Sequence, residues 1–292
     1  MNMQLHKIYR PITATPFKVA RDYMEFEPCD ALKPYIRCFW GTPRPVEQQE
    51  KAADTTGIVT PDTCMDIIFT VDFTNNKIDN CFCGIDDRTF TTCQHNEAHR
   101  TVFLFAIRFY PWGASVFAED SMKDTKNAFF DTGHHFAGLK KAIEPELFEV
   151  KHMEQFIPKA ESALLKYYNE KHKNPLVLQA VHHMLARKGN IQVSELRKAL
   201  FVSERQLERL FREYVGVTPK SLAAMVRYQY LWNDIAYSRQ FNILDAVCQY
   251  GYADQAHLCH DFKKYHAMNI AEAKKYALEN VGNVQETSVI LT

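Results

Sequence analysis

Side chains that can read DNA bases are grouped in this 292-residue chain between residues 203 and 211. Apolar residues recur there at three- and four-residue steps, as on the buried face of a helix. The opposite face would carry Arg205, Glu208 and Arg209. Arginine can bind O6 and N7 of guanine, and glutamate can accept from N4 of cytosine, each contact contributing roughly 1–3 kcal/mol of discrimination. Ser203 is a preferred N-cap, so we predict a recognition helix that begins after it.

A shorter amphipathic helix is expected just before it, over residues 193–200, and a tight turn would join the two. Such a pair is typical of a helix-turn-helix DNA-binding unit. The pattern returns 51 residues later: Ser203, Leu207, Phe211 and Gly216 map onto Asp254, Leu258, Phe262 and Ala267. Upstream, the same offset maps Val193, Leu196 and Phe201 onto Leu244, Val247 and Tyr252, and Arg212 maps onto Lys263. A repeat of this kind indicates two copies of one structural unit.

The second predicted recognition helix presents a different set of outward residues, Gln255, Ala256, Cys259 and His260. Of these, Gln255 suits adenine. A long helix over residues 220–238 would join the two units rigidly. This would place the two recognition helices in adjacent major grooves about 34 Å apart. Phosphate contacts, which position a protein without specifying a sequence, are expected from Lys220, Arg227, Lys263 and Lys264.

The charge of the chain is asymmetric although its formal net charge is zero. Residues from Pro175 onward carry 14 Lys and Arg against 11 Asp and Glu, so the predicted DNA-binding half has a balance of +3. No export signal is seen at the N-terminus, and the longest apolar run is about six residues, far short of the roughly 20 of a membrane span. These features favour a cytoplasmic protein with reduced thiols and no membrane partner.

The first half of the chain has several short strand signals separated by turns, of which residues 100–110 give the strongest. We expect two strands or a hairpin over 58–73, a short pair formed by 82–85 and 88–92, and an amphipathic helix over 148–168 with a kink or restart at Pro158. The fold class is therefore α+β, with an antiparallel β-rich N-terminal domain, flanking helices and an all-α C-terminal domain. The expected units are a sensor and dimerisation domain (1–173), a DNA-binding domain (174–281) and a loose tail (282–292).

Three further features leave alternatives open. Soft metal ligands are present at Cys81, Cys83, Cys93, His95 and His99, but their spacing matches no closed metal site, and buried cysteines are more often core residues. The helix over 148–168 could form a dimer surface or pack on its own sheet. Aromatic side chains could line an effector pocket or fill the core, and they are Phe39, Trp40, Phe109, Tyr110 and Trp112.

Motifs that carry catalysis are missing, since there is no Gly-rich phosphate loop, no nucleophile elbow and no HExxH sequence. We therefore predict that the chain is not an enzyme and needs no cofactor. A metal- or thiol-dependent domain tethered to DNA is the alternative hypothesis.

Both predicted units resemble the DNA-binding domain of the AraC/XylS family of bacterial transcription regulators. The first signature appears as Ser203, Arg205, Leu207, Arg209, Phe211, Gly216 and Pro219, and the second as Gly251, Tyr252, Asp254, Gln255, Leu258, Phe262 and Lys263. The chain departs from the family at His260, Ala267 and Ile270, where Arg, Gly and Pro are usual, so the second reader could bind bases more weakly. The resemblance implies a sequence-specific regulator, more often an activator, that contacts double-stranded DNA and RNA polymerase and can answer to a small-molecule effector or form a homodimer. It also implies that Arg209 can brace the fold instead of reading a base.

Overall fold

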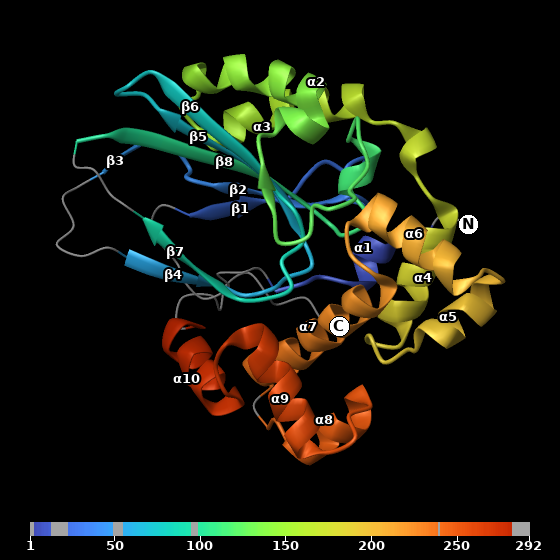
Figure 1. The fold of residues 1–292 in the computed structure, drawn as a ribbon. Helices are drawn as coiled ribbons and strands as arrows, with labels where there is room; N and C mark the ends of the chain where they lie inside the picture. Colours follow the sequence, from blue (N-terminus) through green and yellow to red (C-terminus); the bar gives the residue numbers. More distant parts are fainter. Residues whose placement is uncertain (1–2, 13–22, 49–54, 95–98, 239, 282–292) are drawn as a thin grey trace.

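The strand predicted over residues 100–110 is the centre of the N-terminal sheet (Figure 1). In the computed structural model, which describes residues 3–12, 23–48, 55–94, 99–238 and 240–281, β8 (Thr101–Phe109) pairs antiparallel with β2 (Ile36–Gly41) and β5 (Met65–Asp72). The strand order is β1-β2-β8-β5-β6-β9, and β3 also pairs with β8. The remaining strands are β1 (Met24–Phe26), β3 (Val46–Glu47), β6 (Lys77–Cys83) and β9 (Phe129–Phe130).

Alternation along β8 sends its phenylalanines to one face, which α2 (Gly133–Ile143) and α3 (Met153–Tyr167) cover. Phe105 meets Phe156 of α3 edge-on at 4.9 Å between ring centroids, and Phe109 stacks on Phe136 of α2 at 6.0 Å. These contacts form the main core of the domain. Short 3-10 helices flank it at Ala114–Val116, Glu144–Glu149 and Glu170–His172.

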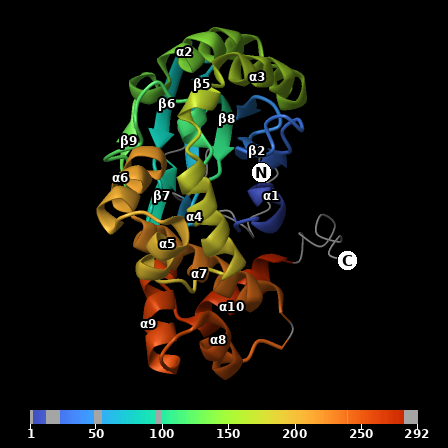
Figure 2. The same ribbon diagram turned by 90° about the vertical axis from the view of Figure 1, so that its right-hand side faces the viewer.

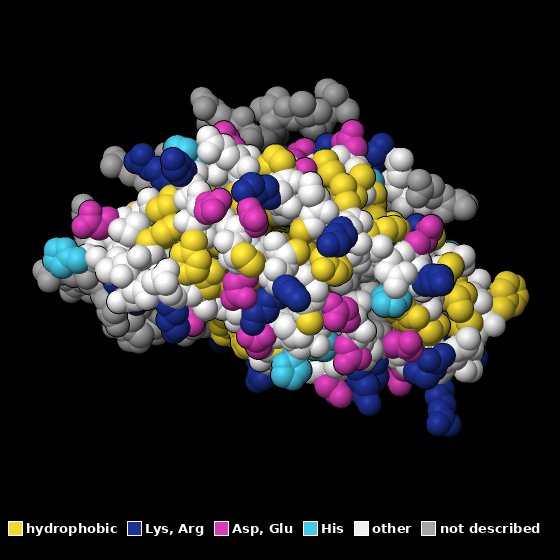
Figure 3. All heavy atoms as spheres, turned by 90° about the horizontal axis from the view of Figure 1, so that it is seen from above, with side chains coloured by type: hydrophobic (Ala, Val, Ile, Leu, Met, Phe, Trp, Pro, Cys, Tyr) yellow, Lys and Arg dark blue, Asp and Glu magenta, His cyan; other side chains and the backbone are white. Residues whose placement is uncertain are grey.

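The apolar stripe of α3 therefore packs on its own sheet, which is the second of the two alternatives predicted for it. Pro158 lies inside one continuous helix, so the helix does not restart there. Leu165 is 48% exposed. Figure 3 views the molecule from the side of α2, where charged side chains of both signs are interspersed with hydrophobic ones.

Of the two alternatives predicted over 58–73, two separate strands are confirmed, whereas the predicted pairing of 82–85 with 88–92 is wrong. Strand β4 (Thr55–Val59) pairs with β7 (Phe90–Gln94) in a separate two-stranded sheet, whereas β5 pairs with β6. The segment between β4 and β5 leads the chain from one sheet to the other, with Thr63 at a positive φ of 66° and the Asp62 carboxylate accepting from the Cys64 N–H. Alternation defines which residues form strands, but it does not define which strands pair.

Seven helices follow, and they carry the helix-turn-helix units (Figure 2). Asn174 caps the first of them through its side chain, and Pro175 occupies the first helical position, where its missing N–H leaves no helical hydrogen bond unmade. No helix among the described residues is long and apolar enough to cross a membrane. The helices are α4 (Pro175–Ala186), α5 (Val193–Leu200), α6 (Glu204–Val215), α7 (Pro219–Tyr237), α8 (Ile243–Tyr250), α9 (Gln255–His266) and α10 (Ile270–Val281).

The two halves of the chain are joined by hydrogen bonds from the middle of α7. Gln229 is 2% exposed; its Oε1 accepts from the Ile12 N–H at 2.9 Å, and its Nε2 donates to the Pro61 carbonyl at 2.6 Å. The hydroxyl of Tyr230 donates to the carbonyl of Ile8, which lies at the end of α1 (Leu5–Ile8). One helix turn therefore holds two separate segments of the N-terminal half.

Gln229→Met tests this junction. We expect the free energy of unfolding to fall by about 2–4 kcal/mol, because one buried N–H and one buried carbonyl lose their partner while the side-chain volume is retained. Chemical denaturation followed by circular dichroism measures the change. Gln155→Met, on the exposed side of α3, is the matched control and should change the midpoint little. Equal stability of the two variants would contradict the assigned role.

Candidate nucleic-acid interface

The first predicted recognition helix is α6, and it begins where expected. The Ser203 hydroxyl accepts from the Gln206 N–H at 3.1 Å, which satisfies one of the free N–H groups of the first turn. Leu207 and Phe211 are fully buried, whereas Arg205 is exposed. The same face carries Glu208, which is half-buried, and Arg209, which is exposed and pairs with Glu213 at 2.9 Å.

Helix α9 repeats this arrangement. The Asp254 carboxylate accepts from the His257 N–H at 2.7 Å, and Leu258 and Phe262 are fully buried. In Figure 2, α6 and α9 both lie to the left of α7, with α6 beside the lower part of the N-terminal domain and α9 below it. The outward residues are Gln255, Ala256 and His260, all exposed, and Cys259, which is half-buried.

The register of the repeat changes inside the unit. Helices α6 and α9 begin 51 residues apart, but α5 and α8 begin 50 residues apart, so the second turn contains one more residue. The counterpart of buried Leu196 is therefore Ala246, not Val247, and the counterpart of Phe201 is Gly251, not Tyr252. Phe201 and Gly251 both end their helix in the left-handed conformation, with φ of 54° and 67°.

Three of the four predicted phosphate-contacting residues are exposed lysines, Lys220, Lys263 and Lys264. Arg227 differs. Its side chain is 18% exposed, its Nη2 lies 2.9 Å from the Asp261 carboxylate, and its guanidinium stacks 4.2 Å from the centre of the Tyr252 ring. Since Asp261 belongs to α9, this contact braces α9 against α7. The guanidinium is engaged inside the domain, which does not fit the phosphate contact predicted for Arg227.

Residues 196–276 match the profile of a helix-turn-helix domain, the same residues that form α5 to α9 and the start of α10. These residues are an AraC-type helix-turn-helix domain. Residues 24–131, which span the N-terminal sheet, match a domain of unknown function (DUF6597). No curated protein matches the chain.

Solved structures of ToxT from Vibrio cholerae resemble the whole chain at low identity. One is 11% identical, covers 90% of this chain and 100% of its own, and has a TM-score of 0.37. ToxT bound to an unsaturated fatty acid is 10% identical, covers 89% and 95%, and has a TM-score of 0.39. The AraC-type assignment therefore rests on the profile match and on the two capped helices, and it identifies a DNA-binding transcription regulator.

The five aromatic residues predicted to line an effector pocket lie at separate places in the fold. Phe39 and Phe109 are fully buried and lie in the core under the helices, stacked on Phe105 and Phe136. Trp112 is 4% exposed; it stacks on Tyr110, and its Nε1 donates to the carbonyl of Pro34. Packing explains these three positions and also Tyr110, which is 5% exposed. The fifth residue, Trp40, lies on the face of the sheet opposite Phe39.

That other face holds a buried ion cluster that the sequence analysis missed. Arg108 is 5% exposed and forms two hydrogen bonds to Asp66, at 2.9 and 3.2 Å. Its Nη1 has no hydrogen-bond partner in the described part of the chain and lies 3.6 Å from Asp62. Trp40 lies 5.1 Å from the guanidinium and donates to Asp66. Burial lowers the pKa of Arg108, but the two carboxylates outweigh it and raise the pKa above its ordinary value. The sequence feature that could have indicated this cluster is Arg108 itself, a single charged residue in the otherwise largely apolar strand β8.

The cysteines give no metal site among the residues whose placement is described. The thiols of Cys81 and Cys83 lie 3.7 Å apart on β6. His99 is exposed, whereas the side chain of Cys93 and the whole of His95 lie outside the described residues.

The inner face of α9 contains a buried histidine that packs the second reader on α7. His266 is 3% exposed; its ring lies 4.3 Å from that of Trp232, and its Nδ1 is 2.8 Å from the hydroxyl of Tyr228. Burial lowers the pKa of His266 to about 4. The imidazole is therefore neutral in the folded domain at pH 7.

His266→Phe should reduce the pH dependence of stability. Below pH 6.5 the unfolded chain protonates this histidine, whereas the folded chain does so only near pH 4. In that window the unfolded state binds more protons, so stability falls by about 3 kcal/mol as the pH falls from 6.5 to 4. Urea denaturation across this range should show that part of the slope lost in His266→Phe and retained in His260→Gln. A slope unchanged by His266→Phe would refute the assignment.

Proposed function

We propose that the protein is a sequence-specific transcription regulator whose helices α6 and α9 enter two adjacent major grooves. The observation that carries this proposal is the matched construction of the two helices. Each begins at a side-chain cap, buries one face in the domain and leaves base-reading side chains exposed at its N-terminal half. Both are packed on α7, so one rod sets their separation and orientation.

The base contacts fall to the N-terminal half of each helix. Arg205 and Gln255 occupy the second and first helical positions, where both side chains are exposed, and they suit guanine and adenine. Glu208, Ala256, Cys259 and His260 complete the base-reading set. Arg209 is shared between reading a base and pairing with Glu213. Lys220, Lys263 and Lys264 supply phosphate contacts that hold the register.

The N-terminal domain supplies the response to an effector in this proposal. The cluster of Arg108, Asp66 and Trp40 lies on the sheet face away from the core helices and contains an aromatic ring and a buried N–H that has no partner among the described residues. Because two carboxylates already neutralise the arginine, the cluster favours a neutral polar molecule over an anion. Asp62 links this cluster to the Pro61 carbonyl that Gln229 of α7 binds. An effector bound at the cluster would therefore act on α7, the helix on which both α6 and α9 are packed.

The remaining functions follow the family resemblance. We propose activation of transcription through contact with RNA polymerase and a homodimer built on the N-terminal domain. The apolar stripe of α3 is buried in its own domain, so the dimer would use another surface.

Two substitutions separate base reading from phosphate contact. Arg205→Ala should weaken binding to the preferred sequence by about 5- to 150-fold and hardly affect random DNA, because it removes a base-specific contact. Lys263→Ala should weaken binding to both DNAs alike and lower the slope of log K against log salt by about 1. Fluorescence anisotropy on a sequence selected from a random library measures both effects.

Lys77→Ala, which removes an exposed charge from β6 in the N-terminal sheet, is the control and should leave both affinities unchanged. If Arg205→Ala and Lys263→Ala lose affinity equally on selected and random DNA, the assigned roles are wrong.

A further inference from the structure

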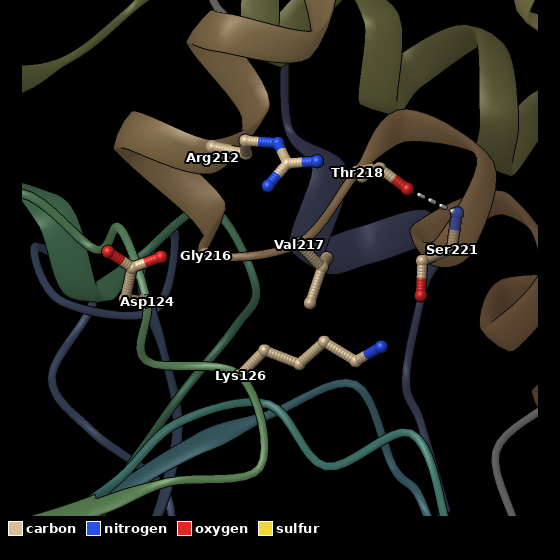
Figure 4. A pocket seen from close by; sticks show the side chains of 7 residues that line it. All are labelled: Asp124, Lys126, Arg212, Gly216, Val217, Thr218 and Ser221. Carbon is tan, nitrogen blue, oxygen red and sulfur yellow. Dashed lines mark hydrogen bonds between the residues drawn. The ribbon is translucent and has the colours of Figure 1, made fainter.

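A cavity of about 340 Å³ lies between the two halves of the protein, away from the N-terminal ends of α6 and α9 (Figure 4). One wall is a loop of the N-terminal domain that precedes β9. The other wall is the turn from the end of α6 into the start of α7. Its lining residues are Asp124, Lys126, Arg212, Gly216, Val217, Thr218 and Ser221.

Backbone contacts hold the two walls together. The Met122 N–H donates to the Glu213 carbonyl at 2.8 Å, and the Thr125 hydroxyl donates to the Met122 carbonyl at 2.7 Å. Gly216 has a φ of +80°, and a Cβ on it would lie 2.4 Å from the hydroxyl oxygen of Thr125. The close approach of the loop to the end of α6 therefore requires glycine at this position.

Two cations face the cavity from different domains. Figure 4 shows the Arg212 guanidinium above Val217 and the Lys126 amine below it, with both side chains running toward the side where Thr218 and Ser221 lie. Lys126 pairs with Asp87, which leaves some of its three N–H donors for another acceptor. Arg212 is exposed and makes no ion pair within the described part of the chain. A planar guanidinium with free donors is suited to bind two oxygens of one anion.

The third side of the cavity is the beginning of the 19-residue helix α7. The Thr218 hydroxyl accepts from the Ser221 N–H at 3.2 Å, and the Ser221 hydroxyl points toward the cavity in Figure 4. The positive end of the helix dipole adds to the field of the two cations. A guanidinium, an ammonium and a hydroxyl thus converge from three directions.

We propose that this cavity binds a phosphomonoester that bridges the two domains. A tetrahedral phosphate has an oxygen for each of the three donor groups, whereas a planar carboxylate has only two. Asp124, on the side of the cavity across from Ser221, can accept from a hydroxyl on the organic part of the ligand. The bound phosphate would fix the end of α6 to the N-terminal domain. The site is separate from the DNA contacts of the proposed function, because it includes none of the residues assigned to bases or phosphates of DNA.

Isothermal titration of the full chain without DNA tests the proposal. Inorganic phosphate and glycerol 3-phosphate serve as probes, with acetate as the carboxylate. We expect one saturable site for both phosphates at roughly millimolar concentration or tighter and none for acetate. Arg212→Gln and Lys126→Gln should each weaken binding by about tenfold or more, since each removes a charge-assisted contact.

Lys123→Gln is the matched control: Lys123 is exposed, lies in the same loop, loses the same charge and does not line the cavity. It should bind both probes as the original chain does. Arg212 is exposed, so Arg212→Gln should keep the thermal midpoint, which separates loss of the site from loss of the fold. The proposal is overturned if neither phosphate shows saturable binding or if acetate binds equally well. It is also overturned if both cavity variants keep the original affinity. Because no DNA is present, these results are independent of the tests of Arg205 and Lys263.

Discussion

The burial of α7 is the constraint on which the rest of the structure depends. This helix has Leu222, Met225, Leu231, Trp232 and Ile235 at or below 1% exposure, and it contacts helices of both helix-turn-helix units. Its middle turn also holds the N-terminal half through Gln229 and Tyr230. A helix that is buried on all of these sides cannot bend or rotate without disturbing each of them. The two helix-turn-helix units and the N-terminal sheet are therefore all held by this one helix.

Polar contacts define the details of this arrangement, since apolar packing alone is tolerant of small rotations. Arg227 and Asp261 fix α9 to α7, and Tyr228 meets His266 one turn later. On the other side, Met122 and Glu213 fix the loop before β9 to α6. The first reader is thus held by the N-terminal domain as well as by α7. A change in the sheet can reach α6 through this loop and α7 through the segment around Pro61.

The helical half of the fold and its readers could be predicted from sequence because their signals are local. The caps at Ser203 and Asp254 and the apolar period of α6 and α9 lie within single turns, and all are confirmed. The extra residue in the second turn was missed, so Val247 and not Ala246 was matched to Leu196. Both residues are apolar, and the helical period alone does not distinguish them. The pairing of β4 with β7 was missed because it depends on contacts far apart in the chain.

The roles of residues whose partners lie elsewhere in the chain could not be predicted from the sequence either. Arg227 is a brace only because Asp261 and Tyr252 lie against it, and Arg108 is an ion-cluster residue only because Asp66 and Asp62 surround it. For the aromatic residues, by contrast, the sequence predicted a ligand-binding role where the structure shows packing. Phe39, Phe109 and Trp112 have the composition of a pocket, but they fill the core.

The spacing between the two half-sites of the DNA tests the central account most directly. A rigid α7 predicts that the selected site contains two short recognised segments about one helical turn, or 10 base pairs, apart. Binding to a series of sites in which only this spacer is lengthened, by about half a turn and by one turn, is the measurement. The account predicts that both insertions reduce binding to the level of a single segment. Undiminished affinity for either spacer would contradict it.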